Sequence, residues 1–116
     1  MGALASVAAD EPVALAAITA SELLAGVQRA DSIQRRARRE AFVEAIIDLV
    51  PVLPIDLRVA RIHAGIWAQL MAAGHTIGAH DMLIAATALA YGYSILTDNV
   101  REFHMVPGLS VRQPIW

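Results

Sequence analysis

Three acidic side chains of this 116-residue chain lie where their carboxylates could do chemistry. Glu22 follows an apolar run by about one helical turn, and Asp81 precedes the most apolar helical segment. Asp98 directly follows another apolar run and has Asn99 beside it. Converging carboxylates repel one another, so their burial is costly unless a cation compensates them. Mg²⁺ or Mn²⁺ held by oxygen ligands provides that compensation and can activate water for attack on a phosphodiester.

Each of these residues also has a purely structural interpretation. The segment Thr19-Ala-Ser-Glu22 matches a capping box, in which Thr19 is the N-cap of a helix and Glu22 its third residue. Asp81 suits the first turn of a helix, where the macrodipole favours a negative charge. Asp98 and Asn99 are ordinary turn formers after a strand. Taken singly, each residue is better explained by structure, whereas together they favour a shared metal site.

The elements that must position these residues follow from the spacing of apolar and helix-breaking residues. Helices are predicted over residues 19–28, 32–49, 56–74 and 81–92, and short strands over 13–18, 52–55, 93–97 and 109–113. Residues 3–9 resemble the end of a helix, and residues 98–103 a turn with one helical turn. This alternation predicts an α/β fold with a mostly parallel sheet covered on both faces. Ligands of such sheets bind outside the carboxyl ends of the strands, where the acidic residues are expected to meet.

Apolar stripes on the predicted helices indicate the core. The helix over residues 56–74 has such a stripe at Val59, Ile62, Ile66 and Leu70. In the helix over residues 32–49, apolar residues recur every four positions from Ile33 to Leu49, opposite a charged face. His63, Trp67 and Met71 extend along the edge of the first stripe, which favours a core position, with a homodimer face as the alternative.

Composition excludes several classes of protein. The chain is 57% hydrophobic and has no cysteine, which excludes a disordered segment, a disulfide scaffold and thiolate-bound zinc. The uncharged run over residues 82–97 is shorter than the about 20 residues of a membrane span, and the first residues lack the basic region of a secretory signal. We therefore expect a cytoplasmic protein of one domain, with no membrane partner. No glycine-rich loop joins a predicted strand to a helix, which disfavours a nucleotide-binding fold.

Three segments resemble motifs of the PIN-domain nucleases and occur in the same order as in that family. They are residues 18–26 (ITASELLAG), residues 77–86 (IGAHDMLIAA), and residues 96–103 (LTDNVREF) followed by 106–109 (VPGL). The closest subgroup is the VapC toxin of bacterial toxin–antitoxin pairs. The resemblance implies a single PIN-like domain over residues 1–116, with a three-layer fold in which helices flank a parallel sheet.

The resemblance also implies an activity. It predicts a Mg²⁺- or Mn²⁺-dependent endoribonuclease, the toxin of a type II toxin–antitoxin module, with RNA as substrate, a VapB-type antitoxin as inhibitor and a homodimer as assembly. Glu22 and Asp81 correspond to metal-site acids, and the fourth acidic position falls on either Asp98 or Asn99. Thr97 resembles a hydroxyl that orients the site, and Glu102 matches an acid expected at its periphery. The alternative is an inactive PIN-fold module that dimerises and binds an antitoxin.

One departure from the family is large. Its members begin with a strand that ends in a metal-binding aspartate, and this chain has no such segment. Either an upstream segment is missing, leaving the domain incomplete at its N-terminus, or the chain is a degenerate copy. The missing strand is expected between the strands over residues 13–18 and 93–97. Its loss would expose apolar surface and unpaired backbone, so we expect poor solubility and weak or absent nuclease activity.

Basic and imidazole side chains provide a weaker signal. Arginines cluster at Arg35, Arg36, Arg38 and Arg39, where interleaved acids favour a solvated face over an RNA path. His75 and His80 flank the segment before Asp81, but their spacing favours a loop role over zinc binding. His80 remains a candidate for contact with RNA or with a metal-bound water because it adjoins Asp81.

Overall fold

The computed structural model describes residues 4–5 and 13–113 and shows short strands alternating with helices. In chain order, the elements are β1 (Leu4–Ala5), β2 (Leu15–Ala16), α1 (Ala17–Gln28), α2 (Ile33–Leu49), β3 (Val52–Leu53), α3 (Leu57–Ala72), α4 (Ala79–Tyr91), β4 (Ile95–Leu96), α5 (Val100–Phe103) and β5 (Val111–Arg112). The predicted α/β order is confirmed. The strands are shorter than the apolar runs that predicted them, because only two residues of each run pair with a neighbour.

The sheet consists of two parts. β2 pairs with β3 in parallel, with Leu15 opposite Val52, and β4 pairs with β5 in parallel, with Ile95 opposite Val111. β1 pairs with the other edge of β4 in the antiparallel direction and also contacts β2. The predicted parallel pairing is therefore confirmed for both pairs, and β1 is the antiparallel exception.

The prediction of a helix over residues 3–9 is wrong for Leu4 and Ala5, which form β1, while its other positions lie outside the described residues. β1 contacts both β2 and β4, the two strands between which a further strand is expected. A free edge of β4 would leave backbone N–H and C=O groups unpaired, which favours pairing with an apolar segment.

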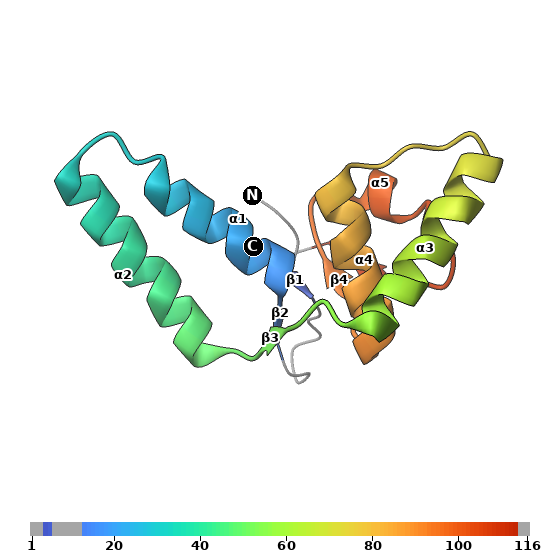
Figure 1. The fold of residues 1–116 in the computed structure, drawn as a ribbon, viewed down its shortest axis with the longest axis horizontal. Helices are drawn as coiled ribbons and strands as arrows, with labels where there is room; N and C mark the ends of the chain where they lie inside the picture. The colour runs from blue at the N-terminus through green and yellow to red at the C-terminus, as the bar shows by residue number, and fades with distance from the viewer. Residues whose placement is uncertain (1–3, 6–12, 114–116) are drawn as a thin grey trace.

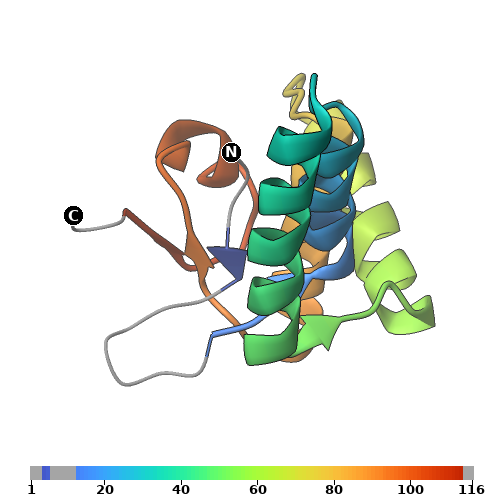
Figure 2. The ribbon, with the colours of Figure 1, turned by 90° about the vertical axis from the view of Figure 1, so that its left-hand side faces the viewer.

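The helices form layers around these strands. Figure 1 shows α1 and α2 as an antiparallel pair at one end of the molecule and α3 with α4 at the other. In the view of Figure 2, α1 to α4 lie together, and α5 lies apart from them, above β1 and β4. None of the helices in the described part of the chain has both the length and the apolar character needed to cross a bilayer.

The core is built around α4, which is apolar on nearly all sides. Its buried residues are Met82, Ile84, Ala85, Ala86, Thr87, Ala88 and Ala90. Small alanine side chains allow neighbouring elements to approach closely, and α4 packs most extensively against α3. The predicted α3 stripe is confirmed, with Val59, Ile66 and Leu70 buried. Gly92 ends α4 as predicted, in the left-handed conformation that glycine adopts without strain.

Two predicted core faces are exposed. On α2, Ile33 and Leu49 are 86% and 82% exposed, and Val43 is the residue that is buried. α2 packs mainly against α1. No second layer therefore covers the ends of the apolar stripe that recurs every four positions along α2. On α3, Trp67 and Met71 are also exposed, so the prediction that they belong to the core is wrong.

Candidate active site

Asp81 and Glu102 form the centre of the candidate site. Asp81 lies in the first turn of α4, and Glu102 lies on the short helix α5. Burial, followed by the charge of Glu102, a hydrogen bond with Glu102 and the charge of Glu22, raises the pKa of Asp81 to about 6. His80 partly offsets this rise. Below this pKa the protonated carboxyl of Asp81 donates to the ionised Glu102, and at neutral pH both side chains are mainly ionised.

Glu102 is held in place by groups from two other segments. The backbone N–H of Gly78, at the N-cap of α4, donates a 2.6 Å hydrogen bond to its Oε1, and the side-chain amide of Asn99 donates to its Oε2. Burial favours the neutral form of Glu102, but the hydrogen bonds from Gly78, Asn99 and Asp81 lower its pKa overall. Glu102 therefore stays ionised beside Asp81.

The turn before α5 is fixed by Thr97. Its buried side chain accepts a 3.0 Å hydrogen bond at Oγ1 from the backbone N–H of Asn99. Asn99 is the N-cap of α5 and Glu102 its third residue, so the Thr97 hydroxyl indirectly sets the position of Glu102. This agrees with the orienting role that the resemblance implies for Thr97.

Glu22 reaches the site from α1. Its Oε2 lies 3.2 Å from Nδ1 of His80, and its Oε1 is buried without a hydrogen-bond partner among the described residues. The capping-box interpretation is wrong, because α1 begins at Ala17 and Thr19 is buried within the helix. Alanine is the best helix former, which allows α1 to start one turn earlier than predicted. Glu22 is therefore not explained by helix capping.

The structure brings some of the predicted site residues together and leaves one apart. Glu22 and Asp81 are close enough to interact electrostatically, and Asn99 joins them through Glu102. Asp98 is exposed, and no hydrogen bond or ion pair connects it to another of the described residues. Glu102, expected at the periphery, contacts Asp81 instead. The Asn99–Glu102 spacing, which is that of an N-cap and the third helical residue, is the signal that could have placed it.

The donor chemistry of these residues fits a hard divalent cation. Carboxylate oxygens are the ligands that Mg²⁺ and Mn²⁺ prefer. The buried, unpartnered Oε1 of Glu22 and the raised pKa of Asp81 both indicate negative charge without compensation. No three Asp, Glu or His side chains in the described ranges form a ready-made ligand cluster, so a bound ion would draw these acids closer together.

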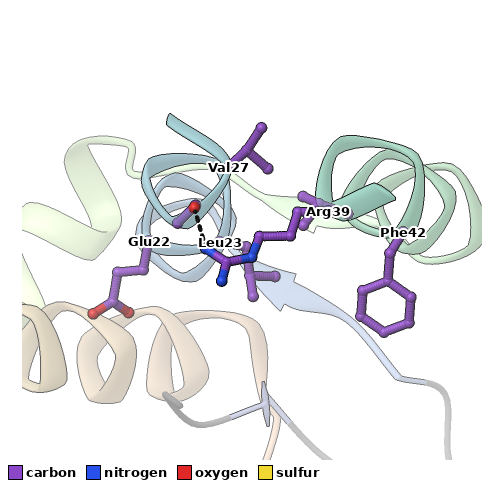
Figure 3. A pocket seen from close by; sticks show the side chains of 7 residues that line it. Glu22, Leu23, Val27, Arg39 and Phe42 are labelled. Atoms are coloured by element: carbon purple, nitrogen blue, oxygen red, sulfur yellow. Dashed lines mark hydrogen bonds between the residues drawn. The ribbon is translucent and has the colours of Figure 1, made fainter. Parts of the chain in front are cut away.

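A groove adjoins Glu22 on α1. It has a volume of about 270 Å³ and is lined by Glu22, Leu23, Gly26, Val27, Arg39, Phe42 and Val43. Figure 3 shows Arg39 of α2 reaching across to α1, where its Nη1 donates a 3.1 Å hydrogen bond to the carbonyl oxygen of Gly26. Phe42 is 67% exposed, so the groove presents apolar surface next to an acidic side chain.

Comparisons with known proteins agree with this architecture. The family model of the PIN domain matches residues 2–109. Ribonuclease VapC1 of Rickettsia felis is 43% identical to the chain, over 81% of this chain and 70% of the relative. The tRNA(fMet)-specific endonuclease VapC of Salmonella typhimurium is 35% identical, over 84% of this chain and 71% of the relative.

Solved structures of VapC proteins also match the fold of this chain. The crystal structure of DNA-bound VapBC from Salmonella typhimurium matches with a TM-score of 0.81 and 31% identity, covering 86% of this chain and 74% of that chain. The predicted resemblance and the predicted PIN-like fold are therefore confirmed. On the evidence of its fold, its motifs and these relatives, the chain belongs to the PIN-domain family, in the VapC group.

Proposed function

We propose that this protein is a divalent-metal-dependent endoribonuclease and the toxin of a type II toxin–antitoxin module. The observation that carries the proposal is the convergence of Glu22, Asp81 and Glu102, with the pKa of Asp81 raised to about 6. The names of the relatives, which are ribonucleases or a tRNA(fMet)-specific endonuclease, support RNA as the substrate. We place its action in the cytoplasm, where RNA and an antitoxin would be available.

The three acids would hold Mg²⁺ or Mn²⁺. When bound, such an ion supplies positive charge that activates a water molecule and stabilises the phosphate oxygens. Asp81 would bind the ion as a carboxylate, while the hydrogen bonds from Gly78 and Asn99 keep Glu102 ionised and fixed. His80 holds one oxygen of Glu22 and leaves the other available.

Two residues assigned from the sequence have different roles in this proposal. Asn99 orients Glu102 through a hydrogen bond from its side-chain amide. Asn99 would bind the metal ion only after this hydrogen bond to Glu102 is broken. Asp98 remains a predicted site acid on sequence grounds alone. The substitutions Asp98→Asn and Asp81→Asn are chemically identical, so comparing their effects on metal affinity decides whether Asp98 belongs to the acid set.

A VapB-type antitoxin is the proposed protein partner. Solved structures of VapBC complexes support this type of partner. The groove between α1 and α2 offers exposed apolar surface at Phe42 and an arginine at its rim, which suits an amphipathic segment. Because the groove is lined in part by Glu22, an antitoxin bound there would lie next to the acids and block access to them.

A homodimer is the proposed assembly. A second groove of about 390 Å³ is lined by His63, Trp67, Ile77, Ala79, Met82 and Leu83. Trp67 is 53% exposed, and its ring packs edge-on against that of His63, with 6.1 Å between the ring centroids. Light scattering of the chain and of Trp67→Glu tests this assembly. We expect the chain to be a dimer and Trp67→Glu to be a monomer. If the substitution leaves the oligomeric state unchanged, the interface lies elsewhere.

The ribonuclease proposal is tested by incubating the protein with single-stranded RNA and Mn²⁺. Cleavage should stop on addition of a chelator and in Asp81→Asn, while Asp48→Asn provides the matched control because Asp48 is an exposed acid on α2. Mn²⁺ binding is measured in parallel, because a weakly active protein still binds the ion. Cleavage that persists in Asp81→Asn, or Mn²⁺ affinity equal in both variants, would refute the proposal.

A further inference from the structure

Beside Glu22 lies another pocket, which is smaller than the groove between α1 and α2. It has a volume of about 190 Å³ and is lined by Ser21, Glu22, Ala25, Arg29 and His80. Ser21, Ala25 and Arg29 are four residues apart, so they form one stripe along α1 and its C-cap. His80, from the first turn of α4, completes the pocket. It therefore combines a guanidinium and an imidazole with one of the proposed metal-site acids.

In the described part of the chain, the guanidinium of Arg29 is unpaired, unlike those of Arg35, Arg36 and Arg39. Arg35 forms an ion pair with Asp31, and Arg36 and Arg39 donate to backbone carbonyl groups of α1. No hydrogen bond or ion pair of the described residues uses the Arg29 side chain. Its Nη2 lies 3.9 Å from the position that a Cβ would take on Gly26, so the side chain folds back along α1. A planar group with free donors is well suited to phosphate.

His80 keeps the pocket from being dominated by negative charge. Its Nδ1 contacts Oε2 of Glu22 at 3.2 Å, so the acid that lines the pocket has a hydrogen-bonding partner. The second ring nitrogen, Nε2, has no partner among the described residues and is free to donate or to contact a ligand. The protein has a net charge of −2 and places three acids at its site, so an RNA strand needs local cationic contacts to approach.

We infer that Arg29 and His80 form a subsite for an RNA backbone phosphate next to the one that is cleaved. This inference rests on the proposed ribonuclease function. Glu22 lines the pocket and interacts electrostatically with Asp81, so a phosphate held by Arg29 places the adjoining phosphodiester at the acids. Arg29 and His80 are positioning residues in this arrangement. Contacts of this kind do not depend on the base sequence, and they fix the position of the RNA strand on the enzyme.

The test is RNA binding by the full chain, with Asp81→Asn present in every protein to prevent cleavage. The probe is an end-labelled single-stranded oligouridylate, titrated at several salt concentrations. Arg29→Ala should weaken binding about fivefold and reduce the slope of log affinity against log salt by about 0.7, the value for one lost phosphate contact on a single strand. Arg29→Lys should retain most of the slope because it keeps the charge.

Arg38→Ala is the matched control, since Arg38 is exposed on α2 and makes no hydrogen bond or ion pair with the described residues. It should leave both affinity and slope unchanged. A purely structural role for Arg29, such as stabilising the C-terminus of α1, would lower the thermal midpoint without changing the salt slope. Equal slopes for Arg29→Ala and Arg38→Ala, when the parent chain binds both RNA and Mn²⁺, overturn the subsite alone. Failure of the parent chain to bind either RNA or Mn²⁺ overturns the proposed function itself.

Discussion

The backbone N–H of Gly78 donates a 2.6 Å hydrogen bond to Oε1 of Glu102, joining the start of α4 to α5. Gly78 precedes Asp81 by three residues, so this contact also brings the Glu102 carboxylate to Asp81. The first N–H groups of a helix have no partner within the helix and often bind an anionic side chain. Here the anion is a proposed metal ligand, so the helix terminus positions part of the site.

Replacing Glu102 by Gln should weaken Mn²⁺ binding by at least about tenfold, because loss of a ligand's charge should cost no less than loss of a group that orients a ligand. Gln keeps an oxygen to accept from Gly78 but removes the negative charge. Without that charge, the pKa of Asp81 should fall. Calorimetric titration with Mn²⁺ measures the affinity, and Glu44→Gln, an exposed acid on α2, is the control. Equal affinities in the two variants would place Glu102 outside the site.

The stability of the metal-free protein should depend on the protonation of Asp81. Its pKa is raised from the ordinary 3.8 to about 6, so the folded state binds more protons than the unfolded state between these values. The free energy of unfolding should therefore fall as pH rises through this window, and the loss should persist at neutral pH. Glu102, with a lowered pKa, acts in the opposite direction at lower pH, where its protonation removes stability.

Asp81→Asn should abolish the Asp81 part of this dependence. The variant should have a higher thermal midpoint than the parent chain at neutral pH and a similar one below about pH 3, where the carboxyl of Asp81 is protonated in both states. Thermal unfolding followed by circular dichroism across pH provides the measurement. A midpoint that drops at neutral pH would mean that the Asp81 carboxylate stabilises the fold without an ion.

Thr97→Val should disturb the turn that carries Asn99. The valine side chain matches threonine in shape but cannot accept from the N–H of Asn99, so we expect a loss of about 1 kcal/mol in unfolding free energy. Mn²⁺ affinity should also fall, because Asn99 orients Glu102. Chemical denaturation and calorimetry measure the two effects. Thr76→Val, in an exposed loop, should change neither value.

Phe42→Glu should weaken binding of a VapB-type antitoxin without changing Mn²⁺ affinity. The ring lines the groove between α1 and α2 and is largely exposed, so a charge there removes apolar contact area but no core packing. Ile33→Glu is the matched control, because Ile33 is exposed on α2 but does not line the groove. If both variants bind an antitoxin as tightly as the parent chain, the groove is not the docking site.

The helices and the order of elements could be predicted because their signals are local. Asp56 caps α3 through a 2.9 Å hydrogen bond from the N–H of Val59, and Gly92 ends α4, as the sequence indicates. The exposure of the α2 stripe could not be predicted, since periodicity shows that a helix has an apolar face but not whether another element covers it. The same limit explains the wrong placement of Trp67.

Glu22 and Asp81 were found because their positions relative to strands and helices already suggested a common edge. The sequence predicts only a peripheral position for Glu102, because its partner Gly78 is 24 residues away. Long-range contacts of this kind leave little trace in a single sequence. Thr19 illustrates the opposite error. Its spacing to Glu22 satisfied a local capping rule, but the helix begins earlier and buries Thr19 instead.

Calorimetric titration of the full chain with Mn²⁺ at neutral pH tests the central claim most directly, because it asks whether the three acids share an ion. The account predicts saturable binding at one site, weakened at least tenfold by Glu22→Gln, Asp81→Asn or Glu102→Gln. Binding that none of the three substitutions alters, or no binding at all, would contradict the account.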